Sequence, residues 1–219
     1  MTERKLNVLV TAGPTREYLD DVRFLTNASS GKMGFAIAGA AARAGHTVTL
    51  IAGPVVLASP PGVRREDVVS AEEMRNCVLH HFENCDALVM TAAVCDYRPA
   101  KRHPGKIKKD AAELVVRFLR NPDILGEIGA RKGNKILIGF ALEAQAGEHN
   151  ALLKLRQKNL DAVVLNGPQA MAADRSTATI IQRNGHKTVL PEMPKEEIAG
   201  HIVTLLETLA SERTRRQYD

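Results

Sequence analysis

The stretch Leu6-Asn7-Val8-Leu9-Val10-Thr11-Ala12 is a short apolar run that is typical of a buried strand. A long loop follows over residues 13–34, and the small residues from Phe35 to Ala44 predict a helix. The loop closes with Ser29-Ser30-Gly31 just before that helix. Because the first N–H groups of a helix have no partner within it, a helix start attracts anions. This order of strand, loop and helix predicts an α/β protein that binds a phosphate group.

The length of this loop argues against a dinucleotide-binding fingerprint. Gly-x-Gly-x-x-Gly requires a tight turn between strand and helix, whereas a much longer segment intervenes here. The loop holds Arg16, Glu17 and Asn27 among other polar residues, which favours a functional surface over a simple connector. The alternative is a solvated loop whose serines and glycine only cap the helix.

The composition indicates one aliphatic core. Of the 219 residues 44% are hydrophobic and only 4% aromatic, with no tryptophan, so valine, leucine, isoleucine and alanine must fill the interior. Asn184-Gly185 between two apolar runs predicts a hairpin near the C-terminus. Further apolar runs predict buried strands at residues 47–52, 86–94, 135–141 and 162–165.

Helical patterns alternate with these strands, which predicts an α/β, Rossmann-like fold. We expect a mostly parallel sheet with helices on both faces, a basic flap and a C-terminal hairpin. One domain should span residues 1–219, with the flap at about residues 97–119 and a returning strand at Glu113–Phe118. Residues 55–69 are expected to form a loop with an extended piece.

Charge and cysteine content narrow the class of ligand. The net charge is +5, but basic and acidic residues interleave, which favours anionic small molecules over nucleic acid. The three cysteines match no zinc spacing, and their odd number argues against a disulfide framework.

Because there is no signal peptide and no apolar run long enough for a bilayer, we expect a cytoplasmic protein without a membrane partner.

The ends of the predicted strands supply candidate site residues, because ligands of open α/β sheets bind at the carboxyl ends of strands. Asp96 follows the third strand, where the alternative role is a turn residue before Pro99. Phe140 ends the fourth strand and either stacks on a base or belongs to the core. The second strand ends in Gly53-Pro54 and not in an acid, which counts against a dehydrogenase.

Three further segments suit a polyanionic ligand. The basic run over residues 101–109 matches the charge of a triphosphate, although a solvated loop is the commoner explanation of such a run. Lys154 and Lys158 lie four residues apart, so a helix presents both on one face; a solvated pair is the alternative. Asn121-Pro122-Asp123 predicts a helix start with asparagine as the N-cap and proline in the first helical position.

Several stretches together resemble the bacterial phosphopantothenate–cysteine ligases, also called phosphopantothenoylcysteine synthetases, over nearly the whole chain. In many bacteria this activity is the C-terminal half of a fused protein whose other half is a flavin-dependent decarboxylase. The resemblance here is to the ligase half alone, so no flavin is expected. The matching stretches are residues 11–17, 27–34, 92–98, 106–109, 121–124, 139–141 and 154–161.

The resemblance implies a two-step reaction of coenzyme A biosynthesis. The carboxylate of 4′-phosphopantothenate attacks the α-phosphate of CTP, which gives an acyl-cytidylate and pyrophosphate. The amine of L-cysteine then displaces CMP and forms the amide. The family uses Mg²⁺ with CTP and is dimeric, with a site that uses both subunits, so a homodimer is expected.

The resemblance also assigns roles to residues. Asn27 matches the asparagine that the family needs to turn the acyl-nucleotide over, and Lys106 matches the flap lysine needed to make it. Cys95 stands where alanine is common, and we expect a tolerated small residue there and not a catalytic thiol. Metal ligands are not assigned. The expected nucleotide-binding residues are Asp96, Lys106, Asn121, Pro122, Asp123, Ile124, Phe140, Lys154 and Lys158, and the expected substrate-binding residues are Asn27, Ser29, Ser30 and Gly31.

Two other function classes share part of this pattern. An NAD(P)-dependent oxidoreductase would have the first strand but also the tight glycine loop, which is missing here. A non-catalytic nucleotide-binding module would keep the fold and lose the chemistry, and the presence of Asn27 and Lys106 argues against it.

Overall fold

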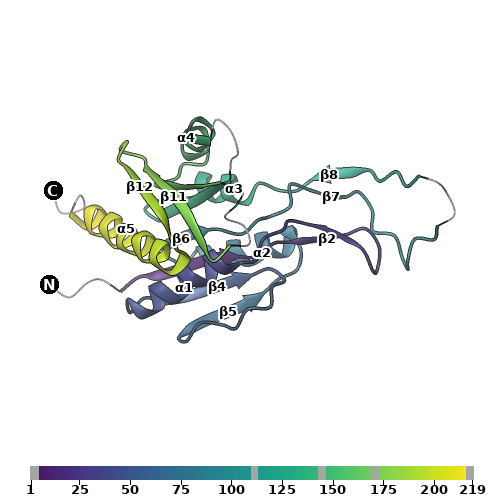
Figure 1. Cartoon of the computed structure of the whole chain (residues 1–219), viewed down its shortest axis with the longest axis horizontal. Coiled ribbons are helices and arrows are strands. Elements are labelled where there is room, and N and C mark those ends of the chain that lie inside the picture. The colour runs from purple at the N-terminus through teal and green to yellow at the C-terminus, as the bar shows by residue number, and fades with distance from the viewer. Residues whose placement is uncertain (1–4, 110–112, 143–146, 168, 170–172, 216–219) are drawn as a thin grey trace.

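The structure is a computed structural model that describes residues 5–109, 113–142, 147–167, 169 and 173–215. Within these ranges one large sheet organises the chain (Figure 1). Its strands are β1 (Asn7–Ala12), β4 (Thr47–Ala52), β5 (Val63–Asp67), β6 (Ala87–Met90), β9 (Ile136–Leu142), β10 (Ala162–Asn166), β11 (Arg175–Gln182) and β12 (Lys187–Pro194).

The strand order of this sheet is β12-β11-β10-β9-β6-β1-β4-β5. The pairs from β5 to β10 are parallel, and the hairpin of β11 and β12 continues the sheet in antiparallel pairing. In chain order the six parallel strands have the 3-2-1-4-5-6 arrangement of doubly wound α/β proteins. The α/β class, the mostly parallel sheet and the C-terminal hairpin are therefore confirmed.

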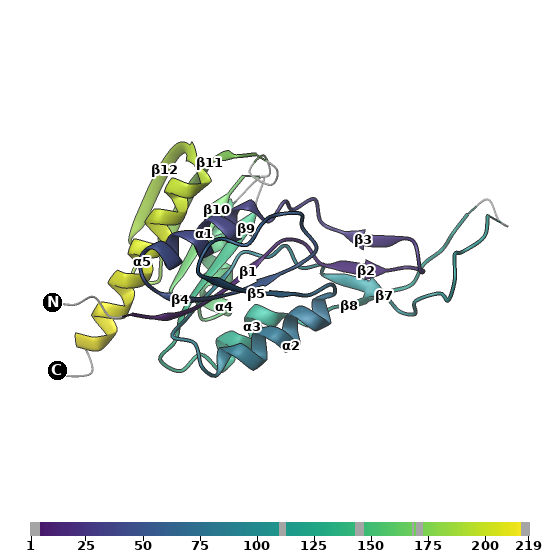
Figure 2. The same cartoon turned by 90° about the horizontal axis from the view of Figure 1, so that it is seen from below.

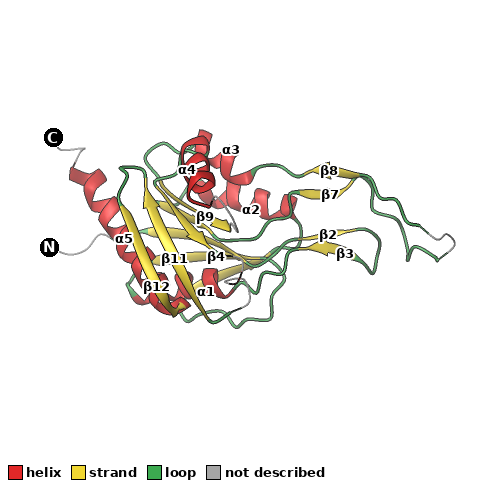
Figure 3. Cartoon of the chain, turned by 45° about the horizontal axis from the view of Figure 1, so that its top comes forward, coloured by secondary structure: helices red, strands yellow, loops and turns green. Residues whose placement is uncertain are grey.

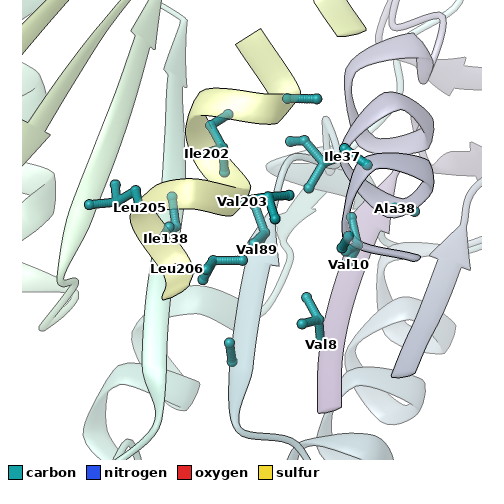
Figure 4. Close-up of a cluster of buried hydrophobic side chains, with 14 of the residues drawn as sticks. Val8, Val10, Ile37, Ala38, Val89, Ile138, Ile202, Val203, Leu205 and Leu206 are labelled. Carbon is teal, nitrogen blue, oxygen red and sulfur yellow. The ribbon is translucent and has the colours of Figure 1, made fainter. Parts of the chain in front are cut away.

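Helices cover both faces of the sheet, as the continuous apolar strands predicted. Val8 and Val10 of β1 belong to the core on one face, whereas Leu9 between them belongs to the core on the other. Figure 4 shows the core that contains Val8 and Val10. There Val203, from the C-terminal helix, lies between the strands and Ile37, which belongs to the helix that follows β1. The first face carries α1 (Lys32–Arg43) and α5 (Lys195–Arg215), and the second carries α2 (Ala71–Phe82), α3 (Ile124–Ala130) and α4 (Gly147–Gln157).

Two short antiparallel ribbons extend beyond the carboxyl ends of the parallel strands (Figures 2 and 3). One pairs β2 (Arg16–Tyr18) with β3 (Phe24–Thr26) and lies inside the long loop after β1. The other pairs β7 (Tyr97–Pro99) with β8 (Phe118–Arg120) and forms the base of the flap. The returning strand expected at Glu113–Phe118 is therefore wrong in its bounds, and residues 110–112 of the flap lie outside the described residues.

Other departures from the predicted elements have local causes. The helix expected from Phe35 begins three residues earlier, at Lys32. The extended piece expected within residues 55–69 is β5, an edge strand of the main sheet. The sequence pattern did not mark β5 as a strand because most of its residues are charged. An edge strand does not need the apolar side chains of a buried strand. Among the described helices, none combines the length and the apolar character that crossing a membrane requires.

Candidate active site

A cavity of about 640 Å³ opens at the carboxyl ends of β6 and β9, beside the N-terminus of α1. The chain order of the strands reverses between β1 and β6, and ligands of doubly wound sheets bind at such a reversal. The volume lies within the range of about 300–1,000 Å³ that holds small ligands. The cavity is therefore our candidate active site.

The N-terminus of α1 approaches the sheet closely at this cavity. Gly34 faces Ala12 and Thr91, and a Cβ placed on Gly34 would lie only 2.5 Å from the Ala12 Cβ and 2.6 Å from the Thr91 Oγ1. Gly31, the N-cap residue, has a φ of 78°, a left-handed conformation that favours glycine. These two glycines let the helix start at the ends of β1 and β6, where Ser29 and Ser30 line the cavity.

The segment 121–124 forms another wall, but its helix starts differently from the prediction. Asp123 is the N-cap of α3, and its carboxylate accepts a hydrogen bond of 3.0 Å from the Gly126 N–H. Asn121 lies before the cap because its side chain has other partners. Its Nδ2 donates to the Cys95 carbonyl at 2.8 Å, and its Oδ1 accepts from Arg98 at 2.9 Å. Asn121 thus joins this wall to the segment after β6.

Lys154 of α4 and Lys158, the residue that follows the end of this helix, both reach the cavity. The Lys154 ammonium donates to the Phe140 carbonyl at 2.5 Å, and Lys158 pairs with Asp123. Both lysines and Phe140 are half-buried and line the cavity. Because neighbouring groups hold both ammonium groups at the wall, an anion in the cavity would meet them in place.

The structure adds residues that the sequence pattern did not single out. Lys32 at the start of α1 and Lys195 at the start of α5 both line the cavity. Burial lowers the pKa of Lys195, and the nearby Lys32 adds to this effect. Asp174 offsets part of the positive charge through an ion pair of 2.5 Å with Lys32. The cavity wall is therefore predominantly cationic, which suits a polyanion.

Asn166 at the end of β10 is a second residue that the prediction missed. It lines the cavity and is only 8% exposed. Its Oδ1 has no hydrogen-bond partner among the residues that the structure describes. A buried amide oxygen without a partner costs stability, which makes it a candidate ligand contact.

The two residues expected to carry the chemistry do not lie with the rest. Of the described residues that line the cavity, none is Asn27 or Lys106. Asn27 is nevertheless adjacent, because its Nδ2 donates to the carbonyl of Ala93, a cavity residue, at 2.8 Å. Lys106 is exposed on the flap.

The flap is held by the loop between β2 and β3. The Asp20 carboxylate accepts from the Ile107 N–H at 3.0 Å, and Asp21 accepts from the Gly105 N–H at 2.8 Å. Arg23 bonds the same Asp20 carboxylate through Nε at 2.9 Å and Nη2 at 2.6 Å, and these bonds hold the pKa of Asp20 far below its usual range. Two aspartates thus fix the backbone on both sides of Lys106.

Glu17 and Cys95 have structural positions. The Glu17 carboxylate is 5% exposed and accepts from the Ala71 N–H at 2.9 Å, at the first residue of α2. Burial raises the pKa of Glu17. The Cys95 thiol is also buried, and burial raises its pKa, so the thiolate is disfavoured. The expected role of Cys95 as a tolerated small residue stays a prediction.

The cavity thus collects most of the predicted site residues, from segments far apart in the sequence. Ser29, Ser30 and Gly31 come from the start of α1, and Asp96 is exposed beside them after β6. The other predicted residues that line the cavity are Asn121, Pro122, Asp123, Ile124, Phe140, Lys154 and Lys158.

Comparison with known proteins identifies the family. A family model described as "DNA/pantothenate metabolism flavoprotein C-terminal domain" matches residues 3–209. The chain belongs to this family. It is 42% identical over 215 residues to the coenzyme A biosynthesis bifunctional protein CoaBC of Bacillus subtilis, covering 96% of this chain and 53% of that protein.

Other members of the flavoprotein C-terminal domain family agree. CoaBC of Escherichia coli K12 is 42% identical over 221 residues, which cover 97% of this chain and 54% of the relative. A crystal structure of the C-terminal domain of CoaBC has a TM-score of 0.83 and 39% identity, covering 94% of this chain and 96% of that one. The chain spans about half the length of the curated relatives it matches, and it matches their C-terminal half.

Proposed function

We propose that this chain is a phosphopantothenate–cysteine ligase that joins 4′-phosphopantothenate to L-cysteine with CTP. The observation that carries the proposal is the cationic cavity at the strand-order reversal, in a chain similar to the C-terminal half of CoaBC. A reaction between a carboxylate and a triphosphate needs positioning and charge neutralisation more than acid–base groups. Lysines from three helices supply that neutralisation.

The first step forms an acyl-cytidylate. A carboxylate oxygen of 4′-phosphopantothenate bonds to the α-phosphorus of CTP as the bond to the pyrophosphate oxygen breaks. Lys154 and Lys158 hold the nucleotide, Phe140 packs against the base, and Lys32 and Lys195 neutralise phosphate charge. The cysteine amine then attacks the acyl carbon and CMP leaves, while the Asn27 amide donates to the acyl oxygen as its charge grows.

Mg²⁺ is expected with the triphosphate, and the donor set fits it. Magnesium prefers oxygen ligands and binds through one or two carboxylates together with substrate phosphates. Asp96 and Asp123 are both exposed carboxylates of the cavity wall, but Asp123 is already engaged, since it caps α3 and pairs with Lys158. Asp96 would therefore hold the ion, which neutralises phosphate charge when bound.

The position of Lys106 supports a site shared between subunits. Two aspartates fix the flap on the same chain, and Lys106 lies outside the lining of its own cavity. We therefore propose a homodimer in which the Lys106 of one protomer serves the cavity of its partner.

Mixing Lys106→Gln and Lys154→Met chains should then restore up to about a quarter of the activity, because some mixed dimers keep one intact site. If mixed dimers are demonstrated and no activity returns, Lys106 serves the cavity of its own chain.

Pyrophosphate release tests the main proposal. Purified protein with 4′-phosphopantothenate and Mg²⁺ is assayed with CTP, ATP, GTP and UTP, with and without cysteine. Turnover that requires 4′-phosphopantothenate and cysteine and prefers CTP would support the ligase and its base preference. No release with any nucleotide, from folded and dimeric protein, would favour a non-catalytic nucleotide-binding module.

A further inference from the structure

A cluster of three metal-ligating side chains lies outside the cavity, between β5 and α2. Glu66 belongs to β5, and Cys77 and His81 lie one turn apart on α2. The Cys77 Sγ lies 3.3 Å from the Glu66 Oε2, and the His81 Nε2 lies 2.9 Å from the same oxygen. The three ligand atoms all lie within 4.8 Å of one another.

These separations are close to those of a tetrahedral zinc site. Zinc bonds of about 2.0–2.3 Å to oxygen, nitrogen and sulfur place two ligand atoms about 3.3–3.7 Å apart. The sulfur–oxygen separation of 3.3 Å and the nitrogen–oxygen separation of 2.9 Å are each a few tenths of an ångström shorter than the corresponding values, and the sulfur and nitrogen lie within 4.8 Å of each other. Side-chain rotations of Cys77 and His81 would therefore place the three atoms around an ion.

The neighbours of the cluster hold its ligands in place. Arg64 bonds the other carboxylate oxygen of Glu66, Oε1, at 2.7 Å, which leaves Oε2 directed at Cys77 and His81. A charge-assisted hydrogen bond to the second oxygen of a carboxylate orients that carboxylate as a metal ligand.

The donor chemistry selects the class of metal. A thiolate, an imidazole and a carboxylate together suit Zn²⁺ and similar transition ions, whereas Mg²⁺ and Ca²⁺ prefer oxygen alone. All three residues are half-buried, so the cluster is not sealed from solvent and water is the natural fourth ligand. The cysteine spacings did not predict this site because it uses only one cysteine, brought to a glutamate by the packing of a helix on an edge strand.

We propose that Glu66, Cys77 and His81 bind one Zn²⁺ ion, with water as the fourth ligand. The ion would fasten the edge strand β5 to α2. None of the three residues is among the described residues that line the cavity, so this site is separate from the proposed ligase site.

Metal titration of the whole chain tests the proposal. The protein is freed of metal with a chelator, dialysed and titrated with Co²⁺, whose thiolate charge-transfer band reports sulfur ligation. We expect one equivalent of Co²⁺, displaced by Zn²⁺, and a rise in the unfolding temperature with Zn²⁺. Zinc should also protect Cys77, and not Cys85, from alkylation mapped by mass spectrometry; this readout needs no variant.

Matched variants locate the ion. Cys77→Ser and His81→Gln should each weaken Zn²⁺ binding by about 100-fold or more, because losing a ligand exceeds the loss from an outer-shell partner. His80→Gln, at the exposed neighbouring position, should bind within a few-fold of the original chain. Unchanged affinity in both ligand variants, or unprotected Cys77 in zinc-loaded protein, would overturn the proposal. A folded original chain that binds no Zn²⁺ would overturn it as well.

Discussion

Replacing Asn27 by aspartate should separate the two steps of the proposed reaction. The Asn27 Nδ2 donates to the Ala93 carbonyl at 2.8 Å. In Asn27→Asp a carboxylate oxygen takes the place of this donor and faces the carbonyl oxygen. The hydrogen bond is lost and a half-buried acceptor is left unsatisfied, which costs about 1–3 kcal/mol, or roughly 5–150-fold in rate if it falls on the transition state.

The second step should lose more than this. An amide nitrogen carries two hydrogens, so Asn27 can hold Ala93 and still donate to the acyl oxygen. Removing one donor of this kind costs about 10²–10³ in rate. We therefore expect amide formation to fall at least about 100-fold. The first step depends on cations, the lysines of the cavity and Lys106 of the flap, and not on the Asn27 amide, so we expect it to fall less than about tenfold.

The assay follows both products in one reaction. Rapid-quench sampling should show a burst of about one pyrophosphate per site, an acyl-cytidylate detectable by mass spectrometry, and slow amide formation. Thr26→Ala is the matched control, because it removes a hydrogen bond of the same loop that goes elsewhere: the Thr26 hydroxyl donates to the Thr15 carbonyl at 2.7 Å. Its two steps should keep their original ratio. Normal amide turnover in Asn27→Asp would refute the role given to Asn27.

Four further outcomes are expected. Lys106→Gln should form no detectable acyl-cytidylate in mass spectrometry, because it removes the flap cation; finding the intermediate would exclude Lys106 from the first step. Asp161→Ala should lower the free energy of unfolding by about 3–5 kcal/mol in urea, since it leaves Lys132, 6% exposed and 2.7 Å from Asp161, as an unpaired buried charge. Asn166→Ala should raise the KM of a substrate about 5–150-fold without lowering the unfolding temperature; the reverse pattern would make Asn166 structural. The folded-state pKa of Asp20 is depressed, so its contribution to the free energy of unfolding is present above about pH 4 and is lost as the pH falls towards the folded-state pKa. Asp20→Asn should therefore make the free energy of unfolding depend less on pH in the acid range.

Local patterns predicted the parts of the fold that depend on local physics. The apolar run of β1 and the Asn-Gly turn between β11 and β12 each carry their own signal, and both are where the sequence indicated. The predicted start of α3 was wrong because two possible N-cap residues, Asn121 and Asp123, lie two positions apart, and tertiary contacts decide between them. Asn121 is engaged by Cys95 and Arg98, which leaves Asp123 as the cap.

The site was predictable to the extent that a motif marked it. Asp96 and Phe140 were singled out because they lie at or just after the ends of predicted strands, although β6 stops at Met90 and β9 continues to Leu142. Lys154 and Lys158 were singled out because of their spacing. Asn166 ends β10, so the same strand-end rule could have singled it out. Lys195 carries no such mark, since it reaches the cavity only through the packing of α5. Lys106 is the opposite case. Its motif is clear in the sequence, but the motif does not say which cavity the lysine serves, and Lys106 does not line the cavity of its own chain.

The buried Lys195 connects the positive charge of the cavity with the kind of ligand that the cavity favours. Lys195 is almost fully buried with Lys32 nearby, and both effects lower its pKa, so keeping it protonated opposes folding at neutral pH. A polyanion in the cavity would reverse this effect, because negative charge favours the protonated lysine. The bound ligand should therefore stabilise the fold beyond its direct contacts. The same cations that make the empty cavity unfavourable thus favour a triphosphate over a neutral ligand.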